Sequence, residues 1–558
     1  DEDGEERTVI AWIWARTVMC PNPACGCEMP LIRSFNLSSK KKNQTHIFPI
    51  IEGNKIRYEL KSGGTLRAGT VSRRGARCIC CDSPVDFPYI REMGKRGHIN
   101  NQMMAIVADG NPGRIYTTPN ERHVLAADVL KPECYPDAII PTNPRDFKTP
   151  NYGMDNFSDL FSNRQMKTLV TLSELVNEAQ EMIIADAKMG GMSKDGVSLH
   201  DGGKEATAYA QAIGVYLAFA VDKMTNYHCN LASWHSSREL LQCTFARQAL
   251  PMVWDFAEGN PLSNSSGSFG NMLNWVLKCI VNFPTDPQGV ATQASAQSDV
   301  GLREALISTD PPYYDNIGYA DLSDFFYLWM RQMLKDTYPE LFNTMLTPKE
   351  DELVATPYRF DGNVKKARDF FETGMSKAFL RIREYASLNF PVTVYYAYKQ
   401  SESTKDNTKG GATASTGWET MLSAIIESGF LITGTWPVRT EMESRALARG
   451  GTNALASSIV LVCRKRSGDA PICTRRDFIN ALKREFKPAL DKLQESNIAP
   501  VDMAQSAIGP GMAVYSRYSK VLEANGEAMT VRSALQIINQ ELDLYFSDQD
   551  GELDSDSR

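Results

Sequence analysis

The chain has 558 residues, which is too long for one ordinary core, so two to four domains are expected. An apolar fraction of 42% and a charged fraction of 23% are typical of a soluble globular protein, and the most apolar run, AIGVYLAFAV, is too short to span a bilayer. The formal charge of −7 hides an uneven distribution, because both ends are acidic whereas residues 31–100 hold 14 Lys/Arg against 5 Asp/Glu, which fits either a polyanion-binding surface or a solvated one.

The first domain, residues 1–110, is predicted to be a small basic module rich in β-structure. Short β-like runs such as THIFPII and KIRYEL alternate there with turn residues. Residues 111–250 are predicted to combine a connector with helices. Residues 101–160 are rich in Pro, Asn and Asp, which favours irregular structure. Helical patterns follow over residues 165–186, 204–227 and 236–249.

Residues 251–467 are predicted to form an α/β domain, because strand and helix patterns alternate along them. Asp321 is the expected N-cap of its first helix, and its last helix is expected to end in Gly429. The alternation predicts a mostly parallel sheet, whose last two strands, joined without a helix, pair antiparallel. The expected strands are 305–309, 391–398, 430–438 and 454–466, and the expected helices are 321–334, 363–387 and 417–429.

The C-terminal part is predicted to be a helical extension over residues 468–546. Helical patterns run from 475 to 545. Residues 547–558 are rich in acids and poor in apolar side chains, which predicts a disordered tail.

Two short cysteine pairs in the basic module have the spacing of a structural zinc site. One is C-x4-C and the other, about fifty residues later, is C-x2-C, so each pair can bend the chain into a knuckle that supplies two thiolates. The predicted ligands are Cys20, Cys25, Cys78 and Cys81. Cys27 and Cys80 are rivals, but x2 and x4 spacings suit a knuckle better than x1. The alternatives are unpaired core cysteines and a disulfide set, which the lack of a secretory signal disfavours.

The run DPPY at residues 310–313 directly follows the predicted strand 305–309. In open α/β sheets, ligands bind beyond the carboxyl ends of the strands. Two consecutive prolines fix the backbone there, and an acid and an aromatic ring flank them. The motif therefore predicts a binding site for a flat polar group. A Pro-Pro turn capped by Asp310 is the structural alternative.

Together with WIWARTVMCPNPACG, RQALPMVWDFAEGNP and TWPVRTE, this motif resembles those of the adenine-specific DNA methylases that contain a Zn-ribbon domain. The resemblance implies a partial class I Rossmann-like methyltransferase core with an inserted zinc ribbon and helical extensions. It further implies S-adenosylmethionine as cofactor, a structural zinc, double-stranded DNA as partner and a cytoplasmic location. Residues 111–250 would then contribute to target recognition, in a restriction-like or phage-defence setting.

The chemistry of amino-methylation gives the motif residues distinct roles. Adenine N6 is a poor nucleophile, and a carboxylate and a backbone carbonyl that accept its two N–H groups direct its lone pair toward the methyl donor. Asp310 would provide the carboxylate and Pro311 the carbonyl, held in direction by Pro312. Tyr313 would stack on the flipped-out base. Further candidates for base or DNA contacts are Tyr314, Asn316, which could instead cap a turn, and Arg439.

The glycine-rich cofactor loop that the resemblance implies is missing from the sequence. Residues 187–196, 265–271 and 409–417 are glycine-rich but lack a suitable preceding strand. We therefore expect this loop upstream of Asp1 or in a separate chain, and no methyl transfer by the present chain alone. A cytosine-N4 or RNA amino-methyltransferase and a non-catalytic zinc-ribbon DNA-binding subunit are the alternatives.

Three further residues have a local structural explanation beside a functional one. Asp255 and Glu258 could contact cofactor or DNA, but a capping or salt-bridge role is at least as well supported. Trp436 could reach DNA, and we expect it instead to be a strand-end aromatic in the core.

Overall fold

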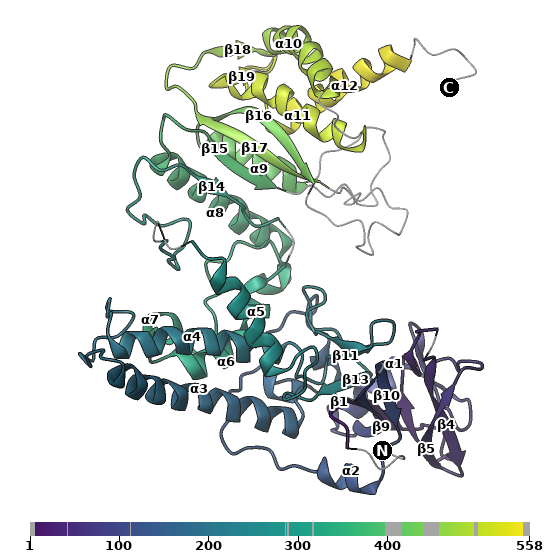
Figure 1. Ribbon diagram of the computed structural model, residues 1–558. Helices are drawn as coiled ribbons and strands as arrows, with labels where there is room; N and C mark the ends of the chain where they lie inside the picture. The colour runs from purple at the N-terminus through teal and green to yellow at the C-terminus, as the bar shows by residue number, and fades with distance from the viewer. Residues whose placement is uncertain are drawn as a thin grey trace. The chain divides into compact units, whose positions relative to one another are not determined.

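The computed structural model describes residues 6–550 except 42, 112, 285, 287–288, 315–316, 397–415, 440–456 and 496–499. The chain divides into two compact units (Figure 1). Unit 1 comprises residues 1–291 and 318–350, and unit 2 comprises residues 292–317 and 351–558. Within the described residues, no helix is both long and apolar enough to cross a bilayer.

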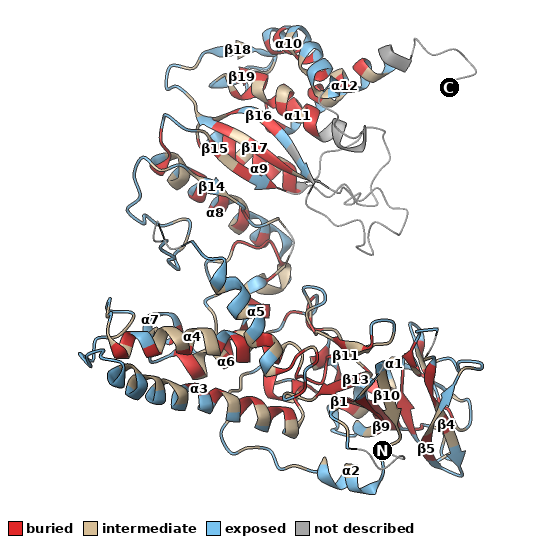
Figure 2. Ribbon diagram, in the orientation of Figure 1, coloured by how far each residue is buried: buried red, intermediate tan, exposed pale blue. Residues whose placement is uncertain are grey.

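Unit 1 is built around an antiparallel sheet with the strand order β10-β9-β1-β13, and β2 pairs with the end of β1. Figure 2 shows β1 and β9 to be largely buried, which explains their runs of consecutive apolar residues. The irregular structure expected over residues 101–160 is therefore wrong for the hairpin β9–β10. The strands are β1 (Val9–Met19), β2 (Glu28–Leu31), β9 (Asn100–Gly110), β10 (Gly113–Thr117) and β13 (Asp255–Gly259).

Short hairpins and one helix fill the chain between β2 and β9, which confirms the β-rich character predicted for this segment. The expected β-like runs THIFPII and KIRYEL are β4 and β5, paired through eight residue pairs. The elements are β3 (Asn36–Ser38), β4 (Thr45–Glu52), β5 (Lys55–Ser62), β6 (Val71–Ser72), β7 (Gly75–Arg77), β8 (Pro84–Val85) and α1 (Phe87–Lys95).

The helical part of unit 1 confirms two of the three predicted helices. The helix α3 begins with a capping box in which Ser162 and Gln165 bond each other's backbone, and it lies alongside α4 (Figure 1). The helices are α2 (Glu121–Ala126), α3 (Asn163–Met189), α4 (Ala206–Thr225), α5 (Phe269–Val281), α6 (Tyr319–Leu334) and α7 (Pro339–Phe342), with 3-10 turns at Thr149–Tyr152 and Phe157–Leu160.

The helix expected over 236–249 is wrong, because a two-stranded hairpin of β11 (Ser233–His235) and β12 (Leu240–Gln242) occupies part of this segment. Its turn contains Glu239 in a left-handed conformation (φ 54°), and the buried Glu239 carboxylate forms an ion pair with Lys40 at 2.5 Å. The Trp234 indole also donates to the Leu37 carbonyl at 2.8 Å. These tertiary contacts, distant in sequence, override the local helical pattern.

The sheet of unit 2 has the order β14-β15-β17-β16. Only β14 and β15 are parallel, whereas β17 is antiparallel to both of its neighbours. The expected antiparallel pairing of the last two strands is confirmed, but a mostly parallel sheet is wrong for the described strands, because β17 returns between β15 and β16. The strands are β14 (Ser308–Thr309), β15 (Val392–Tyr396), β16 (Phe430–Arg439) and β17 (Ser457–Lys465).

Helices pack on this sheet, and α11 also runs along its edge strand β16. The Ile432 amide of β16 donates to Ser516 Oγ at 2.9 Å, and Thr435 Oγ1 donates to the Ser506 carbonyl at 2.9 Å. The first bond satisfies a backbone amide of an otherwise open strand edge, and the second ties a side chain of β16 to α11. The remaining elements are a 3-10 turn (Pro357–Phe360), α8 (Val364–Tyr385), α9 (Thr416–Glu427), α10 (Arg475–Glu495), α11 (Pro500–Ser516), α12 (Val531–Asp550) and the paired strands β18 (Ile472–Thr474) and β19 (Lys520–Leu522).

The unit boundaries differ from the domain boundaries expected from the sequence. Residues 251–291 and 318–350, assigned above to the α/β domain, group with unit 1. The reason is that β13 pairs with β1, and α6 packs on α3 and α4. Asp321 is also not an N-cap: α6 begins after Gly318, and the buried Asp321 carboxylate accepts a hydrogen bond from Asn143 Nδ2 at 3.1 Å.

Candidate functional site

The predicted metal ligands lie at the tips of two β-hairpins in unit 1. The first tip joins β1 to β2 and is closed by the Cys20 amide, which donates to the Cys27 carbonyl at 2.9 Å. The second tip joins β7 to β8 and is closed by the Cys78 amide, which donates to the Ser83 carbonyl at 2.9 Å. Each tip thus folds the two cysteines of one predicted pair into a single turn.

The residue after the second cysteine of each pair adopts the left-handed conformation that such a tight turn requires. Gly26 follows Cys25 with φ 57°, and Asp82 follows Cys81 with φ 58°. Glycine takes this conformation without strain, and aspartate is among the few other residues that tolerate it. The two turns are therefore equivalent local structures, although glycine occupies the left-handed position in only one of them.

The four predicted cysteines converge, and their sulfur atoms all lie within 4.8 Å of one another. Two of the sulfur–sulfur distances, Cys20–Cys81 and Cys25–Cys78, are 3.7 Å. A tetrahedral ion with metal–sulfur bonds of about 2.3 Å separates its ligands by about 3.8 Å. The predicted set is confirmed as a group that could hold a metal ion, and its donors and spacing fit zinc.

The local environment gives the Cys20 and Cys81 thiols different acidities. Hydrogen bonds from the Ser83 hydroxyl and amide lower the pKa of the exposed Cys81 thiol to about 6, whereas burial raises the pKa of Cys20 to about 12. Only thiolates bind metal, so the Cys81 thiolate is available at neutral pH, whereas the Cys20 thiol loses its proton as the ion binds.

The predicted DPPY site lies at the carboxyl end of β14 in unit 2. Thr309 ends this strand, which pairs in parallel with β15 through Ser308–Thr393 and Thr309–Val394. Asp310 follows directly and is exposed, whereas Pro311 is buried. Partial desolvation raises the pKa of the Asp310 carboxyl above its usual range. The Asp310 side chain is thus accessible to a ligand, and the buried Pro311 holds the backbone that follows it.

The two tyrosines of the motif pack on different parts of unit 2. The Tyr313 ring meets the Tyr396 ring edge-on, with centroids 5.1 Å apart, and Tyr396 in turn stacks on Trp418 at 5.5 Å. Tyr313 is half-buried, so part of its ring remains accessible to a ligand. Tyr314 contacts Phe371 edge-on at 5.2 Å. Tyr396 and Trp418 thus pack behind Tyr313, the residue predicted to stack on a base.

The backbone of the motif is also tied to the segment before α8, since the Tyr314 carbonyl accepts a hydrogen bond from the Ala355 amide at 2.9 Å. Pro312 is exposed beside Asp310. Asn316 lies outside the described residues, as does the side chain of Arg439, whose backbone ends β16. These two candidates therefore remain predictions from the sequence.

Asp255 and Glu258 have the local roles that the sequence left open. Asp255 accepts a hydrogen bond from the Arg33 amide at 2.9 Å, and both oxygens of the buried Glu258 carboxylate bind the Arg164 guanidinium, at 2.8 and 2.6 Å. Trp436 contradicts the expectation of a core position, because 65% of it is exposed.

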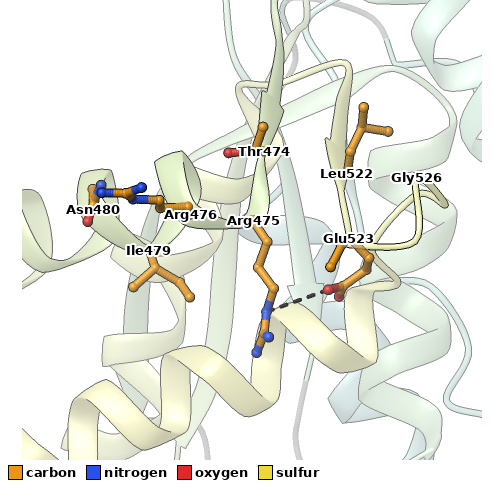
Figure 3. Close-up of a pocket in the computed structure, with 9 residues that line it drawn as sticks. Thr474, Arg475, Arg476, Ile479, Asn480, Leu522, Glu523 and Gly526 are labelled. Atoms are coloured by element: carbon orange, nitrogen blue, oxygen red, sulfur yellow. Dashed lines mark ion pairs between the residues drawn. The ribbon is translucent and has the colours of Figure 1, made fainter.

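A cavity of about 610 Å³ lies at the start of α10 in unit 2. Figure 3 shows Arg475 and Glu523 facing each other across it, with an Arg475 Nε–Glu523 Oε2 distance of 3.5 Å. Its lining includes Arg476 and Asn480 but no residue of the predicted metal or DPPY sites. Sequence reasoning did not single out this cavity, since β18 and β19 were not expected.

Comparisons with known proteins provide no relative for this chain: no family model, curated protein or solved structure matches it.

Proposed function

We propose that the protein is a DNA methyltransferase that modifies the N6 amino group of adenine, with S-adenosylmethionine as methyl donor. The observation that carries this proposal is the position of DPPY, which begins where β14 ends beside the parallel strand β15. In open α/β sheets this end of the strands is where ligands bind. Half of a Rossmann-like sheet that ends in an antiparallel hairpin would have the same pairings: β14 parallel to β15, and β17 antiparallel to β15 and β16.

The base-holding role follows from hydrogen-bonding capacity. An ionised Asp310 and the Pro311 carbonyl are acceptors only, and an exocyclic amino group has two donors. Together they would fix the orientation of N6 and draw its lone pair out of the ring. The absence of an amide hydrogen on Pro311 and Pro312 keeps competing donors away from this edge. Tyr313, supported by Tyr396, would contact the face of the base.

A glycine-rich turn for the cofactor is not found in the described part of unit 2. β14 is followed by DPPY, and the segment after β15 lies outside the described residues. The described residues therefore do not form a site for the cofactor by themselves. Within the described part of the sheet, β14 pairs on one side only. An upstream segment or a separate chain that adds strands at this edge would bring a cofactor site next to Asp310.

The two hairpin tips are proposed to hold a structural Zn²⁺ on Cys20, Cys25, Cys78 and Cys81. Four thiolates close the coordination sphere, so this ion would fix the tips and take no part in the reaction. The turn between β6 and β7, at the opposite end of β7 from the second tip, exposes Arg73 and Arg74. We propose that these guanidinium groups contact the phosphate backbone of double-stranded DNA. The protein would act in the cytoplasm, in a restriction-like or phage-defence role.

The identity of the modified base is the direct test. The complete gene would be expressed in a host without DNA methylation, and digested genomic DNA would be analysed by mass spectrometry. We expect N6-methyladenine with the wild type, none with Asp310→Ala, and wild-type levels with Asp369→Ala, which removes an exposed acid of α8 in the same unit.

Other outcomes of this experiment would redirect the assignment. N4-methylcytosine without N6-methyladenine would overturn adenine as the target. DNA binding without any methylated base would favour a non-catalytic zinc-ribbon subunit. Unchanged N6-methyladenine with Asp310→Ala would show that the motif is not the site.

A further inference from the structure

The two hairpin tips carry two more cysteines than a single tetrahedral ion needs. The additional residues are Cys27, which follows the first tip, and Cys80, which lies within the second. Their sulfur atoms and that of Cys78 all lie within 4.8 Å of one another. This second group shares Cys78 with the group described above.

Packing in the core does not account for this second group. A single buried cysteine behaves as a small apolar side chain, and this would explain Cys27, which has no exposed surface. Cys80 is only half-buried, yet its sulfur points to the same place as the sulfurs of Cys27 and Cys78. The convergence of three thiols from two separate hairpins is the arrangement of a metal-binding site.

The spacing of the three sulfur atoms suits a small thiophilic ion. With metal–sulfur bonds of about 2.3 Å, ligands of one ion lie about 3.8–4.0 Å apart. This separation is compatible with the three sulfur atoms, which all lie within 4.8 Å of one another. A thiolate sulfur retains lone pairs after it binds one ion, so Cys78 can bridge two. Thiolate donors select zinc over hard divalent cations.

We propose that a second Zn²⁺ binds Cys27, Cys78 and Cys80, so that the hairpin tips hold a two-metal cluster in which the Cys78 thiolate is shared. Water fills the fourth position of the second ion. Each thiol that becomes a ligand releases its proton to solvent as the zinc–sulfur bond forms, and no sulfur changes oxidation state. This site is independent of the proposed methyl transfer.

The metal content of the purified chain tests this proposal. The full chain would be loaded with excess Zn²⁺ under reducing, oxygen-free conditions, freed of unbound metal, and analysed by mass spectrometry of the elements. We expect two Zn²⁺ per wild-type chain and one per chain in Cys27→Ser and in Cys80→Ser. Cys134→Ser, which replaces an exposed cysteine of unit 1, should retain two.

A titration with Co²⁺ gives a second measurement. Thiolate-to-cobalt absorption should rise until two equivalents are bound in the wild type and stop at one in Cys80→Ser, whose half-buried position makes it the milder change. One ion per wild-type chain, or two ions retained in both serine variants, would overturn the proposal. So would a Cys27–Cys80 disulfide found by mass spectrometry in the loaded protein. None of these results depends on methylated DNA.

Discussion

Removal of zinc is expected to open the second hairpin tip and expose it to trypsin. The strands that hold this tip are very short: β6 and β7 share two residue pairs, and so do β7 and β8. Hairpins of this size are marginal in water without further support. The proposed support is the metal, which joins Cys78 and Cys81 to the first tip, closed at the end of the long strand β1.

The size of the effect follows from these contacts. Structural zinc sites contribute apparent binding energies of about 10–16 kcal/mol in small zinc domains. If only about 3 kcal/mol of this stabilises the tip against local opening, metal removal raises the opened fraction about 150-fold. Proteolysis follows that fraction when opening and closing are fast.

Trypsin has suitable sites in this region at Arg73, Arg74 and Arg77, which are exposed. We expect rapid cleavage there in chelator-treated protein, slow cleavage in zinc-loaded protein, and rapid cleavage even with zinc present in Cys78→Ser/Cys81→Ser, which removes the thiolate shared by both proposed ions and the other second-tip ligand of the first ion. Cys134→Ser should behave like the wild type. Intact-mass analysis over a time course measures each rate, and equal rates with and without zinc would refute the reasoning.

Two further predictions concern stability. Burial lowers the pKa of His228 from 6.5 to about 4, and its Nε2–H donates to the Gly267 carbonyl at 2.7 Å. As the pH falls, the unfolded chain therefore takes up the proton before the folded chain does. The free energy of unfolding should fall by about 3 kcal/mol between pH 6.5 and pH 4. Denaturant unfolding across this pH range should show that loss in the wild type and much less of it in His228→Gln. An equal change of unfolding free energy with pH in the two proteins would contradict this prediction. Gly509→Ala should cost about 1–3 kcal/mol by thermal unfolding, because its Cβ would lie 2.0 Å from Thr435 Oγ1 where α11 crosses β16. Gly468→Ala, which meets nothing within 4 Å, is the control, and equal melting temperatures would refute the close contact.

The parts of the fold that local patterns determine could be predicted from the sequence. The 3.6-residue periodicity of α3 and its capping box are encoded within one continuous segment. The same holds for α9, which is followed by Gly429 with φ 88°. The two cysteine pairs were predictable as well, because a metal-binding turn needs only a few neighbouring residues.

Contacts between distant segments could not be read from local patterns. The strand β13 joins β1 across about 240 residues, so residues 251–259 looked like the start of another domain. The hairpin β11–β12 replaced a predicted helix because Glu239 is held by Lys40 and Trp234 by Leu37. The convergence of Cys27 and Cys80 on Cys78 also depends on how two separate hairpins meet. The sequence showed these two cysteines only as rival ligands.

The role of Asp310 in holding the adenine amino group is the central claim, and the kinetics of Asp310→Asn test it most directly. This variant keeps the size of the side chain but replaces one acceptor oxygen with a donor. Labelled methyl transfer to DNA would be measured with protein from the complete gene, alongside DNA affinity. We predict a fall in kcat of about 10²–10³-fold with unchanged DNA affinity, whereas Asp369→Asn keeps full activity. A wild-type kcat for Asp310→Asn would contradict the account.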